Sequence, residues 1–499
     1  MSRARKILTD SVTLGVRQTA ALVLTVVQTV VAAYYLRPEG FGTFAIVSIA
    51  TMMASLCTPG FLTAAYRELP HYQTLGDDAK AATVVSHMAV GELAFAILWT
   101  SGIALYAALI YPANVSALLF IVAASVVPMK LVGVWQLLAY GAKDFRLQSK
   151  VDLIRSAVTA LIVIGLVERF GIYIVLLAPV FANVLGILVY RRTLRLPIDW
   201  NHLHRDEFKR LASIGLPNTG INIVNSSSGV QRWAERFLIH SQLGIAYLGI
   251  YAFFTWIALT LMTLTGSVMQ ALQPHIYDVV SRELHQKEIE SYLLRPMWAL
   301  SVGGMLPFGL AAAMQPDLIP MLMPDYASGL PVLHLLLLAA YLNCFYWVPA
   351  VLVFAVRFNG QAYYFLSCAF AVSVSIAIAA AMLHGGYGLI SVAAGFLASQ
   401  VIVGTLTLAK LWPYLFSSPN AAQRFFSQLW VPSLNVVSAL VIVDIVWPLF
   451  ASAATLESHV IAASIKGTAF VVLCLPTLAL VERKLSIFRQ HIRPYLSRN

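Results

Sequence analysis

Fourteen long apolar windows recur along the chain, and they constrain its fold more than any other feature. A helix needs roughly 20 apolar residues to cross the hydrocarbon core of a bilayer, and the windows approach or exceed that length. The windows are residues 14–35, 42–65, 83–110, 116–140, 153–168, 171–190, 213–240, 246–271, 293–314, 328–355, 361–383, 388–410, 429–450 and 459–481. The window at 153–168 is the weakest, because it is short and contains Arg155. We therefore predict an all-α integral membrane protein with about 14 transmembrane helices.

Composition indicates that lipid is the main solvent of this chain. Of its 499 residues, 59% are hydrophobic and only 11% are charged, whereas about a quarter of the residues in an ordinary soluble domain are charged. The four cysteines lie within apolar windows and lack the spacing of a metal site. No nucleotide-binding motif occurs in the sequence. We predict no metal and no cofactor.

The positions of the basic residues predict the orientation in the membrane. With the N-terminus inside, 26 of the 33 Lys and Arg residues lie in inner segments or at the inner ends of spans, and two, Arg37 and Arg169, lie in outer loops. Cytoplasmic loops retain positive charge during insertion, so both termini are predicted to be cytoplasmic. The same spread along short segments leaves no compact basic domain that would hold nucleic acid.

A weak internal repeat predicts two lobes. Residues 36–46 (LRPEGFGTFAI) align with residues 243–253 (LGIAYLGIYAF) at an offset of 207, so that Gly42 matches Gly249. Repeated bundles with the substrate between them are common in transporters. We predict an N-lobe of six spans at 1–195 and a C-lobe of six spans at 196–415 around a central cavity. Residues 416–499 then form two extra helices and a basic cytoplasmic tail.

Three segments carry a resemblance to a known family. The turn at 36–45 (LRPEGFGTFA), the segment 234–252 (AERFLIHSQLGIAYLGIYA) and the segment 323–333 (MPDYASGLPVL) resemble those of Wzx-type polysaccharide flippases. That family belongs to the superfamily of multidrug, oligosaccharidyl-lipid and polysaccharide exporters. The resemblance implies a V-shaped alternating-access fold in the bacterial inner membrane, and an undecaprenyl-pyrophosphate-linked oligosaccharide as substrate. It also implies a polysaccharide polymerase and export machinery as partners beside membrane lipids.

Polar residues recur on one predicted helix face within the seventh window. They follow spacings of three and four residues: Asn218, Asn222, Asn225, Gly229, Arg232, Arg236 and His240. Asparagines within a membrane often form hydrogen bonds between helices, so a purely structural role is the alternative to substrate binding. Helix packing alone does not require two arginines one turn apart, whereas their guanidinium groups match the oxygens of a diphosphate. We predict Arg232 and Arg236 as the principal substrate contacts, with Asn218, Asn222 and Asn225 beside them.

Other charges inside the windows have two interpretations each. Glu92 and Lys130 lie nine and ten residues from the inner ends of their windows, so equal depth favours an ion pair, with Lys130 in the cavity as the alternative. The same arithmetic pairs Asp444 with Lys466. Arg17 either extends to the cytoplasmic headgroups or meets the diphosphate at the inner mouth.

Transport by ion coupling has three candidate residues: Glu92, Glu235 and His240. A lone histidine in a membrane, including His87, is more often a hydrogen-bonded structural residue. The favoured function is a flippase for a lipid-linked oligosaccharide and not an enzyme. One alternative is a polysaccharide polymerase or ligase, but enzymes of that kind have a large outer loop, whereas every predicted outer connection of this chain is short. The other alternative is an ion-coupled drug antiporter. An antiporter for organic cations would need carboxylates where this chain has arginines.

Overall fold

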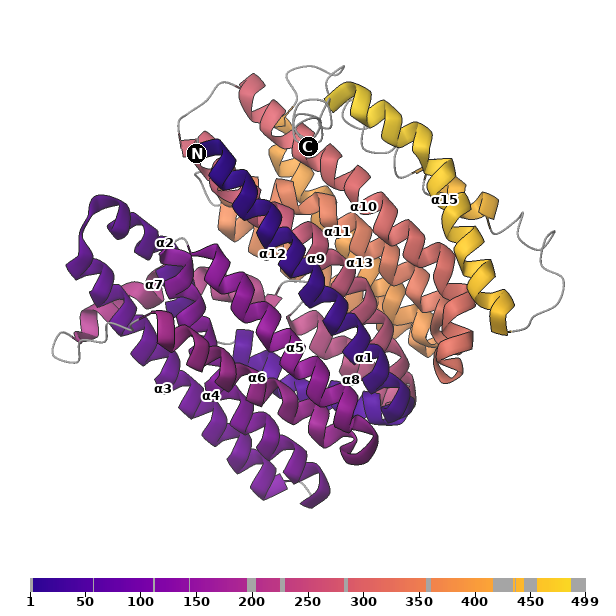
Figure 1. The fold of residues 1–499 in the computed structure, drawn as a ribbon, viewed down its shortest axis with the longest axis horizontal. Helices are drawn as coiled ribbons and strands as arrows, with labels where there is room; N and C mark the ends of the chain where they lie inside the picture. The colour runs from indigo at the N-terminus through magenta and orange to yellow at the C-terminus, as the bar shows by residue number, and fades with distance from the viewer. Residues whose placement is uncertain are drawn as a thin grey trace. The chain divides into compact units, whose positions relative to one another are not determined.

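The computed structural model shows an all-helical chain (Figure 1). It describes residues 3–56, 58–110, 113–142, 144–194, 203–224, 229–281, 286–355, 360–415, 434–435, 437–443 and 456–485. Within these ranges all regular secondary structure is helical, and eight helices are long and apolar enough to cross a membrane. Helices satisfy their backbone hydrogen bonds internally, as the hydrocarbon core of a bilayer requires. The chain is an all-α integral membrane protein, as predicted.

The chain divides into two compact units, residues 1–253 and 254–499. Unit 1 contains α1 (Arg3–Leu56), α2 (Phe61–Leu75), α3 (Asp78–Ile110), α4 (Ala113–Gly141), α5 (Phe145–Phe170), α6 (Ile172–Thr193), α7 (Arg205–Val224), α8 (Val230–Gln242) and the start of α9 (Ile245–Ser281). This division falls within α9, later in the chain than the predicted lobe boundary at 195. The predicted lobes at 1–195 and 196–415 stay a prediction.

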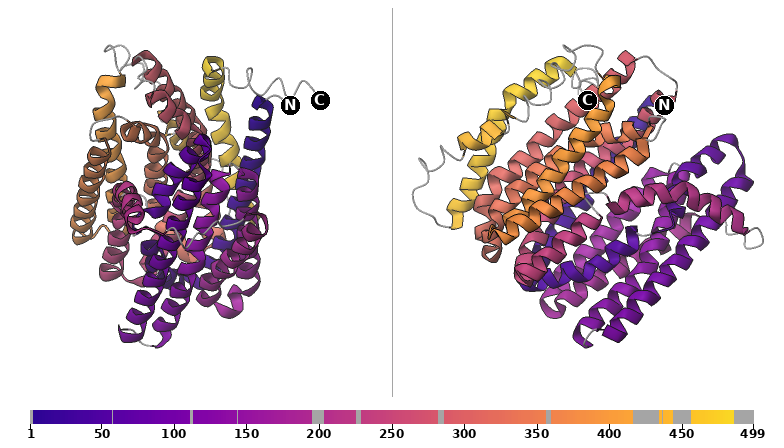
Figure 2. Two further views of the ribbon diagram at one scale, coloured as in Figure 1. Left: turned by 90° about the vertical axis from the view of Figure 1, so that its left-hand side faces the viewer. Right: turned by 180° about the vertical axis from the view of Figure 1, so that it is seen from behind.

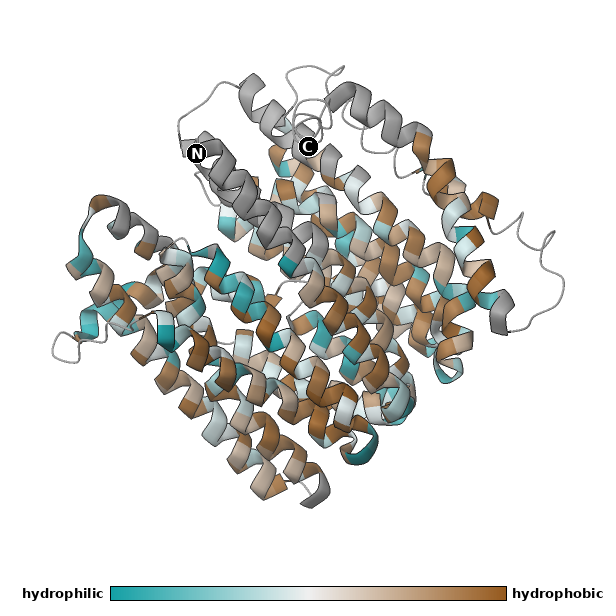
Figure 3. Ribbon diagram, in the orientation of Figure 1, coloured by the Kyte–Doolittle hydropathy of each residue, from teal (hydrophilic) through white to brown (hydrophobic). Residues whose placement is uncertain are grey.

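Several windows of unit 1 correspond to single helices. The windows 83–110 and 116–140 lie within α3 and α4, the window 171–190 matches α6 from its N-cap Gly171 onward, and the weak window 153–168 lies within the 26-residue α5. Figures 1 and 2 show α3 and α4 side by side, and Figure 3 shows hydrophobic residues along both. Helix α1 bends at Arg37, where φ is 55° and Pro38 follows, so the predicted turn between the first two windows is present.

Two windows of unit 1 do not form single helices, which corrects the prediction. The window 42–65 contains the end of α1 at Leu56 and the start of α2 at Phe61. The window 213–240 contains the end of α7 at Val224 and the start of α8 at Val230. Hydropathy averages over a window and therefore does not register a break of a few residues within it.

Unit 2 begins with the remainder of α9 and ends with the described part of the C-terminal region. It contains α10 (Gln286–Leu322), the 3₁₀ helix η2 (Pro324–Gly329), α11 (Leu330–Ala355), α12 (Gly360–His384), α13 (Leu389–Leu415) and α15 (Leu456–Leu485). These helices match the remaining windows, apart from 429–450, most of which lies outside the described residues. The predicted tail beyond residue 485 also lies outside them.

Helix α15 packs against α10 within unit 2. A Cβ added at Gly309 would overlap the Phe470 ring, so the missing side chain leaves room for that ring. Lys466 of α15 forms an ion pair with Asp317 of α10 at 2.7 Å. The predicted partner, Asp444, lies outside the described residues, and the sequence did not indicate Asp317. Pairing by equal depth on consecutive windows missed this contact because α15 packs on a helix far back in the chain.

Candidate functional site

The break between α1 and α2 frees backbone groups inside the membrane, and two charged side chains bind them. Glu92 Oε1 accepts a hydrogen bond from the Leu62 amide at 3.2 Å, and Lys130 Nζ donates one to the Ser55 carbonyl at 3.4 Å. The two side chains also pair with each other at 3.3 Å, and they are only 1% and 8% exposed. The predicted ion pair is therefore confirmed, and it stabilises both ends of the broken span.

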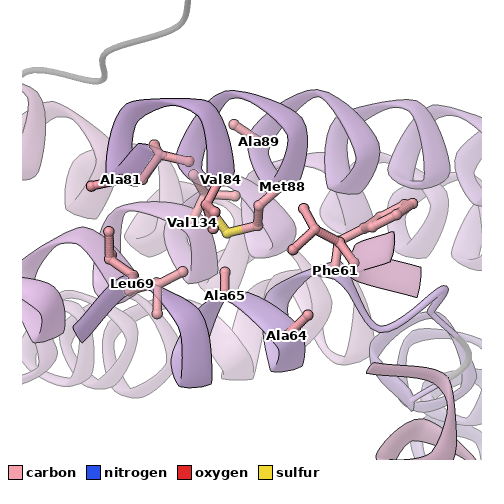
Figure 4. Close-up of a cluster of buried hydrophobic side chains, with 12 residues drawn as sticks. Phe61, Ala64, Ala65, Leu69, Ala81, Val84, Met88, Ala89 and Val134 are labelled. Atoms are coloured by element: carbon pink, nitrogen blue, oxygen red, sulfur yellow. The ribbon is translucent and has the colours of Figure 1, made fainter. Parts of the chain in front are cut away.

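Small residues allow other backbone segments to approach this break. Gly60 has a φ of 83°, and a Cβ on it would overlap the backbone of Gly215 in α7. A Cβ on Gly91 would overlap the Phe61 ring at the start of α2. Figure 4 shows Phe61 beside Ala64 and Ala65, packed against Met88 of α3. The broken span is thus tightly packed on α3 and α7.

The second break divides the predicted polar stripe. Gly229, just before α8, has a non-helical backbone with φ −103° and ψ −132°, so one helical periodicity does not continue from Asn218 and Asn222 to Arg232, and the single stripe is wrong. Asn218 is half-buried and Asn222 exposed on α7, while Asn225 lies outside the described residues. On α8, Arg232 is 5% exposed and His240 is exposed.

Arg236 of α8 contacts the second half of α1. Its Nη1 donates to the Ala45 carbonyl at 2.5 Å and to the Ser48 hydroxyl at 3.2 Å. Over the residues that the structure describes, no ion pair holds Arg236. A partly buried guanidinium is thus positioned by neutral oxygens, and its charge is not neutralised by a direct carboxylate partner.

Glu235 lies next to Arg236 on α8 and faces α9. Its side chain is 3% exposed, and its Oε2 accepts a hydrogen bond from the Tyr251 hydroxyl at 2.9 Å. Its Oε1 is buried and has no hydrogen-bond partner among the described residues. The charges of Arg232 and Arg236 act on this carboxylate. Two guanidinium groups and one carboxylate give this part of α8 a net positive charge.

Arg17 joins α1 to the start of α5. Its Nη1 donates to the Arg146 carbonyl at 3.1 Å and to the Ser149 hydroxyl at 3.3 Å. The side chain is half-buried and held on protein, so it is not simply extended toward lipid headgroups. Arg17 is therefore a fixed cation near the predicted inner end of unit 1.

Two contacts fix the start of α7 outside the predicted spans. His87 Nε2 accepts from the His204 amide at 2.9 Å, and its Nδ1 bonds the Thr83 carbonyl at 2.7 Å, which favours the structural interpretation of this histidine. Arg210 pairs with Glu68 of α2 at 2.8 Å and with Glu207 at 2.7 Å. The hydrogen bonds from Arg210 hold the pKa of the Glu207 carboxyl below its ordinary value.

The sequence did not reveal a polar cluster on α5 and α6. Arg155 marks the weak window 153–168 in the sequence, and in the structure its Nε donates to Asn183 Oδ1 at 3.1 Å and its Nη1 to Asp152 Oδ1 at 3.3 Å. Arg155 and Asp152 are three residues apart on one helix face, which the sequence did offer as a signal. Asn183 is far along the chain and lies in a different window, so only the fold identifies it.

The fold and these buried charges define a class, the multi-pass helical membrane proteins with interrupted spans and ionisable groups inside. Residues 30–290, more than half of the chain, match the family described as polysaccharide biosynthesis protein. The chain belongs to that family. No curated protein sequence matches it.

Solved transporter structures share the fold. The lipid II flippase MurJ in an inward closed conformation has a TM-score of 0.70 at 12% identity, over 95% of this chain and 99% of that chain. An inward-facing multidrug resistance transporter of the MATE family, within the MOP superfamily, has a TM-score of 0.63 at 12% identity, over 83% of this chain and 98% of that chain. The MATE transporter ClbM in complex with Rb⁺ has a TM-score of 0.57 at 14% identity, over 83% and 96%. At such identities the likeness concerns the fold.

Proposed function

We propose that the protein is a flippase that moves an undecaprenyl-pyrophosphate-linked oligosaccharide, such as an O-antigen or exopolysaccharide repeat unit, from the cytoplasmic to the outer leaflet. The family match to polysaccharide biosynthesis proteins supports this proposal, as does the likeness to a structure named as a lipid II flippase. The polar headgroup needs fixed donors in place of water, while the lipid tail stays in the bilayer. Alternating access supplies such a path to each side in turn.

The observation that carries the proposal is the guanidinium of Arg236. It contacts the neutral oxygens of Ala45 and Ser48 and forms no ion pair within the described part of the chain. A cation at membrane depth costs several kcal/mol unless it is paired or faces water, roughly 2.5–3.5 on insertion scales. A diphosphate headgroup would provide that partner through charge-assisted hydrogen bonds. Arg232, one turn away, would add a second cation.

The structure supports the other predicted substrate contacts and ion-coupling residues to different degrees. Arg17 is a fixed cation on α1 and serves as a secondary contact at the cytoplasmic mouth, and Asn218, Asn222 and Asn225 would provide polar groups along the path. Lys130 is less suited to this role, because it is bound to Glu92 and to the Ser55 carbonyl. For coupling to an ion, Glu235 is the favoured carboxylate, since its Oε1 has no hydrogen-bond partner among the described residues. Glu92 and His240 are the weaker candidates.

Two other functions have less support. A polymerase or ligase is expected to carry a large outer loop, whereas the solved structures that share this fold are named as a flippase and as transporters. A drug antiporter for organic cations would favour carboxylates over arginines. The net positive charge on α8 instead favours an anionic headgroup. Enzymes that use the flipped lipid, and the export machinery, are the partners that this function requires.

The test replaces Arg236 by Gln in a strain without the chromosomal copy, with surface polysaccharide as the readout. Hydrogen bonds to charged groups contribute about 1.5–3 kcal/mol, so export should fall about tenfold or more. Arg232→Gln should act in the same direction, and Arg236→Lys should retain part of the activity. Arg169→Gln changes an exposed cation outside this region and is the matched control.

Lipid-linked intermediates separate the flippase from its alternatives. The Arg236→Gln strain should accumulate single lipid-linked repeat units on the inner leaflet. Accumulation on the outer leaflet would indicate a polymerase or ligase instead. Normal export by a double variant of Arg232 and Arg236, with the protein present in the membrane, would refute the assigned role of the two arginines.

A further inference from the structure

Four helices of unit 1 bring aromatic and charged side chains together near one end of the unit. Tyr66 of α2 and Tyr140 of α4 pack edge to face, with ring centroids 5.2 Å apart. Asp152 of α5 acts electrostatically on Tyr66 and on Tyr190 of α6. Arg155 completes this group, which we call the tyrosine–arginine cluster. The cluster plays no part in the headgroup contacts described above.

The position of Arg155 is fixed on three sides. A Cβ on Gly186 would come within 2.9 Å of Arg155 Cδ, so the glycine leaves space for the aliphatic stem. Asn183 Oδ1 accepts from both Nε and Nη2, at 3.1 and 2.5 Å, and Asp152 Oδ1 accepts from Nη1 at 3.3 Å. These contacts use three of the five guanidinium N–H groups, so two donors remain available beside a carboxylate.

The cluster is open in part and contains an unsatisfied group. Tyr66 is 37% exposed, and the side chains of Arg155 and Asp152 are 28% and 34% exposed. Tyr190 is fully buried, packed with Trp135 and neighbouring apolar residues, and its hydroxyl has no hydrogen-bond partner among the described residues. These side chains lie at the inner ends of the predicted windows 42–65, 116–140, 153–168 and 171–190, so water or a polar ligand can reach the exposed side of the cluster from the cytoplasmic surface.

The charges of the cluster indicate what kind of ligand fits. Asp152 repels a diphosphate, and Arg155 repels an organic cation, while together the two charges cancel. A neutral polyhydroxyl compound suits such a pair, because vicinal hydroxyls both donate to a carboxylate and accept from a guanidinium. Tyrosine rings provide an apolar surface for the C–H face of a sugar ring.

We propose that the tyrosine–arginine cluster binds a sugar residue of the lipid-linked oligosaccharide, an inference that rests on the proposed flippase function. Its place on α5 supports this assignment. Ser149, which contacts Arg17, and Asp152 are three residues apart, about 4.5 Å along the helix axis. A diphosphate bound at Arg17 would therefore lie next to a sugar bound at Asp152, which fits a substrate whose first sugar is attached directly to its diphosphate.

The experiment compares two ligands on the purified full-length protein in lipid nanodiscs. One ligand is the lipid-linked oligosaccharide extracted from cells that accumulate it, and the other is undecaprenyl pyrophosphate without sugar. Tyr66→Leu and Asp152→Asn should each weaken binding of the glycosylated lipid about tenfold. Both variants should leave the affinity for the bare lipid within about twofold of wild type. Lys80→Gln, which changes an exposed pair with Asp77, is the matched control.

Each other outcome counts against the inference in a distinct way. Unchanged binding of the glycosylated lipid in both variants overturns it. Equal losses for both lipids in properly folded variants, judged by an unchanged melting temperature, also overturn it, because they indicate a headgroup or structural role. If Tyr66→Leu does not fold, Asp152→Asn decides the question. If the wild-type protein binds neither lipid, the proposed function fails, and the sugar site fails with it.

Discussion

At the scale of single residues, Glu92 and Lys130 neutralise each other and also bind the backbone. Each carboxylate oxygen has its own task, since Oε1 accepts from the Leu62 amide and Oε2 faces Lys130. Lys130 in turn donates to the Ser55 carbonyl. The pair therefore replaces hydrogen bonds that the helix loses where α1 ends. The sequence predicted the pair from equal depth, but not the backbone contacts, because the break itself was not predicted.

The first prediction concerns the loss of one partner. Glu92→Gln should destabilise the protein by about 3–5 kcal/mol, because it leaves the buried Lys130 without a counter-charge. Adding Lys130→Gln should recover part of that loss, since no uncompensated charge remains. Thermal unfolding of the purified variants in detergent measures both effects. Asp77→Asn, in an exposed ion pair with Lys80, should change the melting temperature little. A Glu92→Gln variant as stable as wild type would contradict the stabilising role of the Glu92–Lys130 ion pair.

At the scale of elements, hydropathy predicts the spans and their limits but not their interruptions. The window 42–65 contains Pro59 and Gly60, a turn signal that its high hydropathy outweighed. The polar stripe of the window 213–240 assumed an unbroken helix, which the non-helical backbone of Gly229, at φ −103° and ψ −132°, contradicts. The contact of Arg236 with α1 also was not predictable, because it depends on how distant helices pack.

The second prediction tests the close approach of α7 to the first break. Gly215→Ala places a Cβ against the Gly60 carbonyl, so we expect a loss of about 1–3 kcal/mol in the free energy of unfolding. Gly165→Ala in α5 is the matched control, because nothing lies within 4 Å of its Cβ position. That change should stabilise its helix by roughly 0.5–1 kcal/mol. Opposite shifts in melting temperature are the expected result, and equal shifts would refute the contact.

At the scale of the whole molecule, the internal repeat corresponds to a contact. A Cβ on Gly42 would overlap the Ile245 carbonyl, and a Cβ on Gly249 would overlap the Pro38 carbonyl. At an offset of 207, Gly42 corresponds to Gly249 and Pro38 to Ile245, so the two repeat segments meet through equivalent atoms. Each segment therefore uses the same two positions in this contact, which lies within unit 1. The contact also explains why the start of α9 belongs to unit 1.

The orientation of the whole chain follows from charge and stays a prediction that labelling can decide. Lys80 lies in an inner connection by the count of basic residues, whereas Tyr387 lies in an outer one, and both side chains are exposed. In a variant without the four native cysteines, a membrane-impermeant thiol reagent applied to intact cells should label Tyr387→Cys but not Lys80→Cys. Permeabilised cells should label both. The reverse pattern would place both termini outside, and it would invert the direction in which the proposed flippase moves its substrate.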